Sequence, residues 1–467
     1  MFLPEVTPKL PEGALEKLVD MTYQGRAQYI MGLYLDDFTP EELADFAEKA
    51  YGPDRFDTPE VAPLRKVNDD TYCLELWHGP TCAFKDMALQ MLPHLLTASL
   101  KKNQEEKTVC ILVATSGDTG KAALEGFRDV DKTRILVFYP KDGVSDIQQL
   151  QMATQEGNNV GVSAVVGNFD DAQTGVKTLF SDPELREQLA QRGYFLSSAN
   201  YINWGRVLPQ VVYYISAYCD LLKQGAIALG EAINICVPTG NFGNILAAFY
   251  AREMGLPVQR LLCASNSNNV LTDFIATGTY DRNRLFYNTV SPSMDILISS
   301  NLERLLYLLS GGDDALVADY MRQLSETGRY KVSDPIREQV QSIFIGGYAS
   351  EGDTEKTIAV MKQEYDYLID THTAVAFHVL NQYRVRTGDM TKTVVASTAS
   401  PFKFCDAVLD ALNVTDKASG TALLEQLEQV TGVPAPRPLA TLKDKRVRFD
   451  GWTEKEQMKE VVTDFLK

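Results

Sequence analysis

The sequence predicts an α/β fold built from two open, mostly parallel sheets that carry helices on both faces. The first observation is an alternation, beginning near residue 71, of short β-branched apolar runs with amphipathic helical stretches. The second is that strands joined through such helical crossovers lie parallel in one sheet. The third is size, because 467 residues, 45% of them hydrophobic, can bury two or three separate cores. We expect a cleft between the two sheets.

Three regions are predicted along the chain. Residues 1–70 form a helical N-terminal region, since EGALEKLVDM (12–21) and PEELADFAEKAY (40–51) have helical spacing of apolar residues. Residues 71–205 form a smaller α/β domain, and residues 206–467 form a larger one. Residues 281–365 interrupt the alternation with charged helical stretches, which we interpret as a helical insertion. The expected strands are YCLELW (72–77), TVCILVA (108–114), RILVFY (134–139), NVGVSAVV (159–166), INICVP (233–238), RLLCAS (260–265) and TVVAST (393–398).

Composition argues against several classes of protein. A net charge of −17 disfavours a surface for nucleic acid or for an anionic membrane. The seven cysteines include no C-x-x-C pair, so we predict neither a metal site nor a disulfide framework. We find no leader sequence and no apolar run long enough to span a bilayer, and we therefore expect a cytoplasmic protein.

The stretch HGPTCAFKD (78–86) contains the first candidate functional residue, Lys85. Its Gly-Pro pair predicts a bend, and MALQMLPHLL after it predicts a packed helix that begins near the lysine. A lysine amine that is buried and partly uncharged can condense with an aldehyde cofactor to form a Schiff base. A lysine before a helix is more often a solvated charge, so this interpretation depends on the loops that follow.

Three further loops have the arrangement of a ligand site. ATSGDTG (114–120) follows a predicted strand and precedes a helix, so Thr115, Ser116, Gly117 and Thr119 form a candidate cradle for a carboxylate or phosphate. An ordinary capped turn would have the same sequence pattern. PTGNFGN (238–244) repeats this arrangement without the features of a nucleotide loop, which favours the phosphate of another cofactor. STASPFKF (397–404) places hydroxyls after a third strand. Ligands bind beyond the carboxyl ends of such strands, so the loops are expected to converge.

These motifs together resemble one enzyme family. HGPTCAFKD, ATSGDTG, SSANYINWGR (197–206), PTGNFGN and SPSMD (291–295), in this order over most of the chain, resemble threonine synthase of the pyridoxal-phosphate-dependent, tryptophan-synthase-β-like superfamily, known as fold type II. The resemblance implies pyridoxal phosphate as the cofactor, with Lys85 as its Schiff-base lysine and as the base that moves protons. It also implies that Thr398 makes a neutral hydrogen bond to the pyridine nitrogen. The cofactor phosphate would be held by Gly240, Asn241, Phe242, Gly243 and Asn244.

The resemblance also implies a substrate, O-phospho-L-homoserine, and its conversion with water to L-threonine and phosphate. The substrate carboxylate would bind at residues 115–119, Asp118 included. Its phosphate would be met by Asn203, Arg206 and Lys403, since a guanidinium suits paired phosphate oxygens. For Arg206 an ion-paired or surface arginine is the alternative. The enzyme is expected to be a carbon–oxygen lyase and a monomer or homodimer.

Two parts of the motif pattern are interpreted more conservatively. We interpret Ser293, Met294 and Asp295 as structural, because an Asp beside a helix start is commonly a cap. For His372, a phosphate contact and a packed or capping histidine both remain open.

Two rival functions remain. A phospho-lyase that resembles threonine synthase, or a pyridoxal-phosphate-dependent dehydratase, would keep Lys85 and the phosphate loop but change the contacts to the substrate phosphate. A catalytically silent scaffold would have lost Lys85, which is present.

Overall fold

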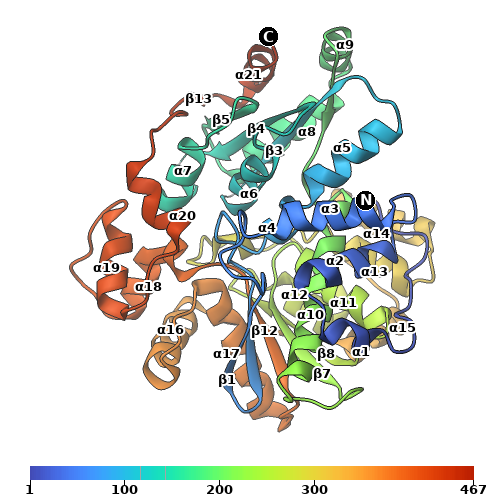
Figure 1. Cartoon of the computed structure of the whole chain (residues 1–467), viewed down its shortest axis with the longest axis vertical. Coiled ribbons are helices and arrows are strands. Elements are labelled where there is room, and N and C mark those ends of the chain that lie inside the picture. The colour runs from blue at the N-terminus through green and yellow to red at the C-terminus, as the bar shows by residue number, and fades with distance from the viewer. Residues whose placement is uncertain (116, 142) are drawn as a thin grey trace.

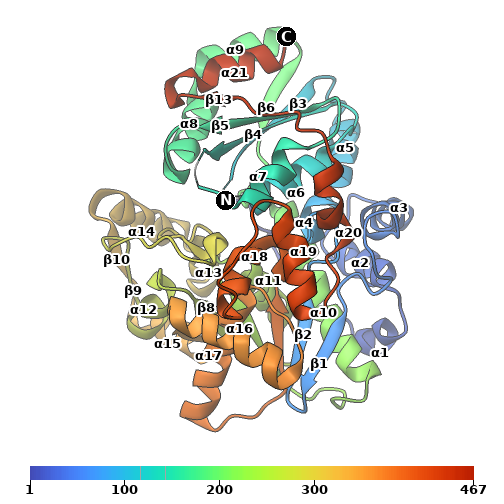
Figure 2. The ribbon, with the colours of Figure 1, turned by 90° about the vertical axis from the view of Figure 1, so that its left-hand side faces the viewer.

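The predicted α/β class is confirmed by the computed structural model, which describes residues 1–115, 117–141 and 143–467. Two mostly parallel sheets lie at opposite ends of the molecule, with helices on both faces of each (Figure 1). Figure 2 shows the smaller sheet above the larger one. The structure therefore has two α/β domains, each with its own sheet and its own core.

The larger sheet has six strands in the order β1-β2-β12-β7-β8-β11. Only β1 and β2 are antiparallel to each other, and the remaining neighbours run parallel. The strands are β1 (Leu64–Asn68), β2 (Thr71–Glu75), β12 (Thr393–Ser397), β7 (Ile233–Pro238), β8 (Val258–Ser265) and β11 (Phe344–Tyr348). Around it lie α10 (Leu208–Lys223), α11 (Gly243–Glu253), α12 (Val270–Thr277), α16 (Glu351–Tyr365), α17 (Thr371–Thr387), α18 (Cys405–Ala411), α19 (Ala422–Thr431) and α20 (Arg437–Ala440).

The smaller sheet has five parallel strands in the order β13-β5-β4-β3-β6. They are β13 (Trp452–Thr453), β5 (Val160–Val165), β4 (Thr133–Pro140), β3 (Thr108–Ala114) and β6 (Tyr194–Ser197). Its helices are α5 (Leu92–Lys102), α6 (Asp118–Phe127), α7 (Asp146–Ala153), α8 (Phe169–Ser181), α9 (Pro183–Gln191) and α21 (Met458–Phe465). The short helix α4 (Asp86–Leu89) lies between the two domains and contacts both α6 and α10.

The period of two along each strand explains why both faces are covered. In β3, Val109 and Ile111 pack in one apolar cluster, while Cys110 and Leu112 pack in another on the opposite face. The first cluster includes residues of α6, and the second includes residues of α8 and α21. Parallel strands that are buried on both faces are apolar throughout, which is why the runs could be recognised in the sequence.

The predicted helical region, residues 1–70, contains the helices α1 (Ala14–Val19), α2 (Tyr23–Gly32) and α3 (Pro40–Tyr51), and it also contains β1 of the larger sheet. Thr39 and Glu42 form a capping box that begins α3, and Pro40 occupies its first turn. The helices α1 and α2 pack on α10, which joins this region to the core of the larger domain.

The sheets divide the chain differently from the predicted boundaries. The strand β2 pairs with β12 in the larger sheet, although residues 71–205 were assigned to the smaller domain. The strand β13 pairs with β5 in the smaller sheet, although residues 206–467 were assigned to the larger domain. The region 281–365 contains β11 of the larger sheet and β10 (Arg329–Lys331), which pairs with β9 (Thr279–Asp281), besides the helices α13 (Leu302–Leu309), α14 (Asp314–Thr327) and α15 (Asp334–Ile343). Long-range pairing decides the sheet to which a strand belongs, and local sequence does not encode it.

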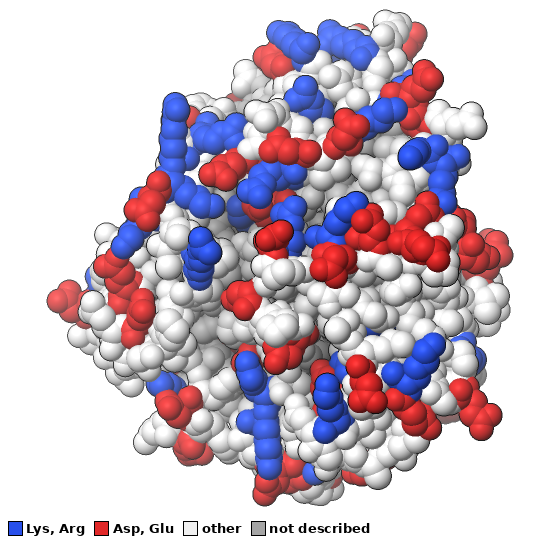
Figure 3. Space-filling model, in the orientation of Figure 1, with Lys and Arg blue, Asp and Glu red and all other residues white. Residues whose placement is uncertain are grey.

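Charge is distributed over the surface in both signs. On the face shown in Figure 3, lysine and arginine side chains are interspersed with aspartate and glutamate. In the described part of the chain, no helix combines the length and the apolar character needed to cross a membrane.

Candidate active site

Lys85 lies immediately before α4 at the junction of the two domains, and its side chain is buried. Its Nζ is 3.2 Å from Oδ2 of Asp118 and 3.2 Å from Oγ of Ser293. The preceding turn is fixed by Asp86, whose carboxylate accepts hydrogen bonds from the backbone N–H and the hydroxyl of Thr81. The HGPT turn therefore aims the lysine at residues of distant loops.

The charges around Lys85 perturb its ionisation. Burial, together with the like charges of Lys403 and Arg206, lowers the pKa of Lys85 below its ordinary value, against the attraction of Asp118. For Asp118, burial would raise the pKa, but Lys403 and Lys85 hold it well below its usual range. Asp118 therefore stays ionised, and the neighbouring Lys85 loses its proton more readily than a surface lysine does.

The loop PTGNFGN leads from β7 into α11, and it leaves no room for side chains at its glycines. A Cβ at Gly240 would lie 2.8 Å from the backbone oxygen of Ser293, and one at Gly243 would overlap the ring of Tyr201. Phe242 has a positive φ of 63° and is buried, which turns the chain into the helix. The loop is a compact backbone turn at the N-terminus of an 11-residue helix.

Side chains of neighbouring segments hold this loop in shape. The carbonyl oxygen of Asn241 accepts a hydrogen bond of 2.8 Å from Nδ2 of Asn301. Oδ1 of Asn244 accepts from the hydroxyls of Tyr213 and Tyr214, at 2.6 and 2.5 Å. Nδ2 of Asn244 is buried and has no hydrogen-bond partner in the described structure. A free donor beside close backbone N–H groups fits an anion such as a cofactor phosphate.

The loop ATSGDTG is held by its own first threonine. Oγ1 of Thr115 accepts hydrogen bonds from the backbone N–H groups of Gly117 and Gly120, at 3.0 and 2.8 Å. Its hydroxyl is thus already engaged within the loop. Gly117 has a φ of 130°, a backbone conformation that glycine adopts readily and other residues rarely do. Thr119 is half-buried, whereas Ser116 lies outside the described residues.

Arg206 is fully buried in the turn that follows SSANYINW. Its Nη1 donates to the carbonyl oxygen of Ala199 at 2.5 Å, and its guanidinium lies 4.5 Å from the ring centre of Tyr201. Its Nε and Nη2 are buried without a hydrogen-bond partner among the described residues. Asn203 uses its side-chain oxygen to accept from the N–H of Gly205, 2.9 Å away, which leaves its amide nitrogen available. Arg206 is therefore a buried cation with two unused donors.

Lys403 and Thr398 bring the loop STASPFKF against the HGPT turn. Nζ of Lys403 is 2.8 Å from Oδ1 of Asp118 and donates to the carbonyl oxygen of Thr81 at 2.9 Å. Thr398 is buried, and its carbonyl oxygen accepts from the N–H of Phe84. The structure thus joins Lys85, Asp118 and Lys403 in one ion-paired group, in which Lys403 neutralises Asp118.

Three further residues lie next to this group. They are Ser293, which we interpreted as structural; His372, which we left open and whose Nε2 accepts from the N–H of Ser293; and Asp370, which is 2.7 Å from Nδ1 of His372. The SPSMD motif was the only sequence signal for Ser293, and Asp370 had none.

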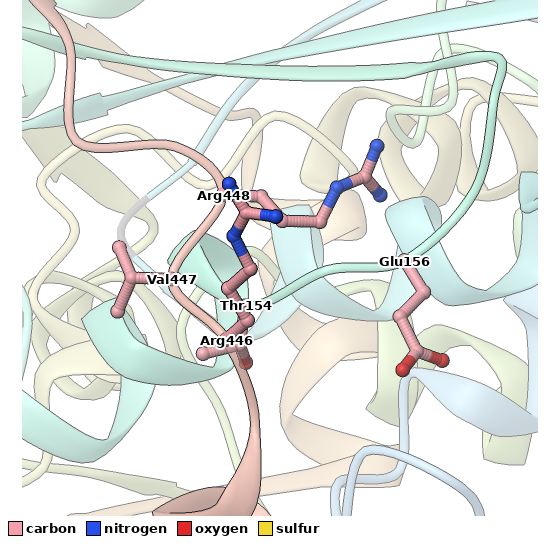
Figure 4. A pocket seen from close by; sticks show the side chains of 5 residues that line it. All are labelled: Thr154, Glu156, Arg446, Val447 and Arg448. Atoms are coloured by element: carbon pink, nitrogen blue, oxygen red, sulfur yellow. The ribbon is translucent and has the colours of Figure 1, made fainter.

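A surface hollow elsewhere contains none of the predicted site residues. It has a volume of about 320 Å³ and is lined by Thr154, Glu156, Arg446, Val447 and Arg448 (Figure 4). Arg448 donates to the carbonyl oxygens of Gln155 and Gly157, just after α7. Cations are favourable at the C-terminal end of a helix, so this hollow marks where the C-terminal segment docks.

Comparisons with known proteins identify the family. Residues 56–332 match the family described as pyridoxal-phosphate dependent enzyme, residues 1–51 match threonine synthase N terminus, and residues 373–462 match threonine synthase, C-terminal. Threonine synthase from Eremothecium gossypii is 35% identical over 498 aligned positions, which cover 100% of this chain and 92% of that protein. Threonine synthase-like 1 from Macaca fascicularis is 42% identical over 89% of this chain, and the match spans 56% of that longer protein.

The fold comparison agrees. The crystal structure of pyridoxal-phosphate-bound threonine synthase from Brucella melitensis is similar, with a TM-score of 0.87, 33% identity, and coverage of 100% of this chain and 93% of that one. The predicted fold type II and the predicted cofactor, pyridoxal phosphate, are confirmed. The chain belongs to the threonine synthase family of pyridoxal-phosphate-dependent enzymes.

Proposed function

We propose that this protein is a threonine synthase, a lyase that converts O-phospho-L-homoserine and water to L-threonine and phosphate. The observation that carries the proposal is Arg206, a fully buried arginine whose charge acts on the buried Lys85 and which has two donors without a partner among the described residues. An unpaired buried cation is costly, so its presence favours an anionic ligand that completes its contacts. The phosphate of the substrate is such a group.

The residues present fit pyridoxal phosphate. Lys85 provides a buried amine for its attachment, and the loop from Gly240 to Asn244 provides close backbone and a free amide donor for its phosphate. Thr398 is the neutral partner that we assign to its ring nitrogen. When bound, the cofactor supplies an electron sink for the bonds that break at the amino acid. Lys85, once its amine is free, would accept and return protons at Nζ, for which its lowered pKa suits it.

The substrate contacts follow from charge and from the remaining donors. We assign the substrate carboxylate to the loop of residues 115–119 and its phosphate to Arg206 and to the free amide nitrogen of Asn203. Lys403 was included with the phosphate ligands, and its ion pair with Asp118 favours a different contribution. By neutralising Asp118, Lys403 would prevent a bare carboxylate from repelling an anionic substrate.

A phospho-lyase of the same family is the second candidate. The observation in its favour is that a relative named threonine synthase-like 1, and not threonine synthase, is 42% identical to this chain, against 35% for the threonine synthase of Eremothecium gossypii, so family membership alone does not fix the reaction. Such an enzyme would share the loss of phosphate and differ in the fate of the remaining carbon skeleton.

The deciding experiment is to incubate the purified protein, loaded with pyridoxal phosphate, with O-phospho-L-homoserine and to follow phosphate and amino-acid products. Threonine in equal amount to phosphate supports the synthase. Phosphate together with a 2-oxo acid and ammonia would instead support the lyase. The absence of phosphate release would contradict both functions.

Arg206→Gln is expected to lower kcat/KM by about 100-fold or more, since a charged contact to phosphate is lost. Exposed Arg386→Gln is the control and is expected to behave as the parent.

A further inference from the structure

Ser293 occupies a position between the two charged groups at the centre of the site. It lies in the short turn Pro292–Met294. Its Oγ is 3.2 Å from Nζ of Lys85 and 3.4 Å from Oδ2 of Asp118. The hydroxyl can therefore accept a hydrogen bond from the lysine while it donates one to the carboxylate.

A buried histidine and aspartate fix Ser293 from behind. The backbone N–H of Ser293 donates to Nε2 of His372 at 3.2 Å. Because Nε2 accepts, the proton of the neutral ring is on Nδ1, where it is donated to Asp370 at 2.7 Å. Asp370 is fully buried and also accepts from the backbone N–H groups of His372 and Thr373, so it is held at the start of α17.

The rest of the turn is fixed as firmly. The carboxylate of Asp295 accepts from Oγ1 of Thr289 at 2.7 Å and from Nδ2 of Asn266 at 2.8 Å. On the other side, the backbone of Ser293 packs so closely on Gly240 that a Cβ there would clash. Such support from three sides is what a side chain needs to hold a reacting group in one geometry.

We propose that Ser293 is a further active-site residue that holds Nζ of Lys85 in position, and that His372 and Asp370 are positioning residues that act through Ser293. This inference rests on the proposed role of Lys85 as the lysine that binds the cofactor. Asp118, Lys403 and Arg206 carry charges that act on Lys85. None of these three charged groups can switch between accepting and donating a hydrogen bond. A hydroxyl can, because it accepts from the ammonium form and donates to the neutral amine.

The inference is tested in the full-length, cofactor-loaded protein with Ser293→Ala. The first readout is the pH midpoint of the visible absorption of the bound cofactor, which reports the proton on the nitrogen of Lys85 and requires no substrate. The midpoint is expected to fall by about half a unit to one unit, because the protonated nitrogen loses an acceptor. The second readout is kinetic, with kcat expected to fall about 10- to 100-fold and KM to change little.

The matched control is Ser342→Ala. Ser342 is exposed near the end of α15, and its hydroxyl donates to the carbonyl oxygen of Gln339 at 2.7 Å, away from the residues of the site. The control is expected to keep the parent midpoint. A Ser293→Ala protein that titrates like the parent and keeps its kcat would overturn the role of Ser293.

The positioning role is tested with two variants of His372. Glutamine offers an amide oxygen that can accept from the N–H of Ser293, whereas leucine offers none. We expect His372→Gln to keep most of the parent midpoint and His372→Leu to reproduce the shift of Ser293→Ala. Equal midpoints for both variants would refute positioning through this hydrogen bond.

The failure of the proposed function can be told apart. If Lys85→Ala retains the covalent cofactor absorption, Lys85 is not the cofactor lysine, and the inference fails with that assignment. If the absorption is lost in Lys85→Ala but the parent makes no threonine, only the proposed substrate is wrong, and the titration of Ser293→Ala still decides the inference.

Discussion

At the scale of single residues, one buried carboxylate organises the charges of the site. Asp118 is 3% exposed, pairs with both Lys85 and Lys403, and also accepts from Nε2 of Gln148 at 2.9 Å. Removing one partner of a buried ion pair leaves the others uncompensated, which costs more than the pair itself contributes.

Asp118→Asn is therefore expected to lower the free energy of unfolding by about 3 kcal/mol at pH 7. Urea unfolding measures it, with Asp69→Asn as the control, because the Asp69 side chain is 91% exposed and pairs with Lys66 at the surface. The control is expected to change stability by less than about 1 kcal/mol. An equal, small effect in both variants would mean that the buried pair carries no net stabilisation of the site.

A second residue links stability to pH. His78 lies between Asp57 and Glu75, at 2.6 Å and 3.0 Å. Burial opposes protonation, but hydrogen bonds to Asp57 and Glu75 outweigh it and raise the pKa of His78 to about 9. Because this folded-state pKa exceeds the unfolded value of about 6.5, the stabilisation is fully present below pH 6.5. It is lost as the pH rises through 9.

The parent is expected to lose about 3 kcal/mol more than His78→Asn between pH 6 and pH 9.5. Urea unfolding of both proteins at the two pH values gives the difference, and groups that titrate in both cancel. Parallel loss of stability in the two proteins would show that His78 is not protonated through this pair.

At the scale of elements, the loop between β7 and α11 is defined by what its backbone touches. Gly240 packs on the backbone of Ser293 and Met294, which cannot yield as a flexible side chain would. The same contact joins the phosphate loop to the turn that faces Lys85. A change at Gly240 therefore reaches both parts of the site.

Gly240→Ala is expected to weaken the binding of pyridoxal phosphate about 10-fold or more, since a displacement of one ångström disrupts several hydrogen bonds. Equilibrium dialysis of the cofactor measures it. Gly352→Ala is the control, because a Cβ there, in the first turn of α16, meets nothing within 4 Å. Unchanged cofactor affinity in Gly240→Ala would show that the close contact is not required for the phosphate.

The same elements show how far the sequence could predict the site. The strands were recognisable because double-sided burial makes them continuously apolar, and the loops were recognisable because glycine patterns are local. The contact of Ser293 with Lys85 could not be predicted, because it joins residues 208 positions apart, which no local pattern encodes. The sheet to which β2 and β13 belong was missed for the same reason.

At the scale of the whole molecule, the chain passes between its two domains more than once, and its last segment returns to the smaller sheet. β13 extends this sheet beside β5, and α21 packs beside α8 at the end of the molecule opposite the larger sheet (Figures 1 and 2). Met458, at the start of α21, is 1% exposed and packs in the cluster that includes Cys110 and Leu112 of β3. The loop with Asp118 follows β3 directly. The C-terminal segment thus supports the half of the active site that lies in the smaller domain.

Met458→Ala is expected to destabilise the smaller domain by about 2–4 kcal/mol, because a buried methionine leaves a cavity when truncated. Met390→Ala is the matched control, since Met390 is 53% exposed, and its effect is expected to stay within about 0.5 kcal/mol. Hydrogen exchange of the amides of β3, β4 and β5 reports the change by domain, and exchange in β7 and β8 is expected to stay near that of the parent. If exchange rises equally in both sheets, the two domains unfold as one unit and the C-terminal segment supports the entire fold. If it rises in neither, the contact of α21 with β3 contributes little, and the loop of Asp118 is held from within the site by Lys85 and Lys403.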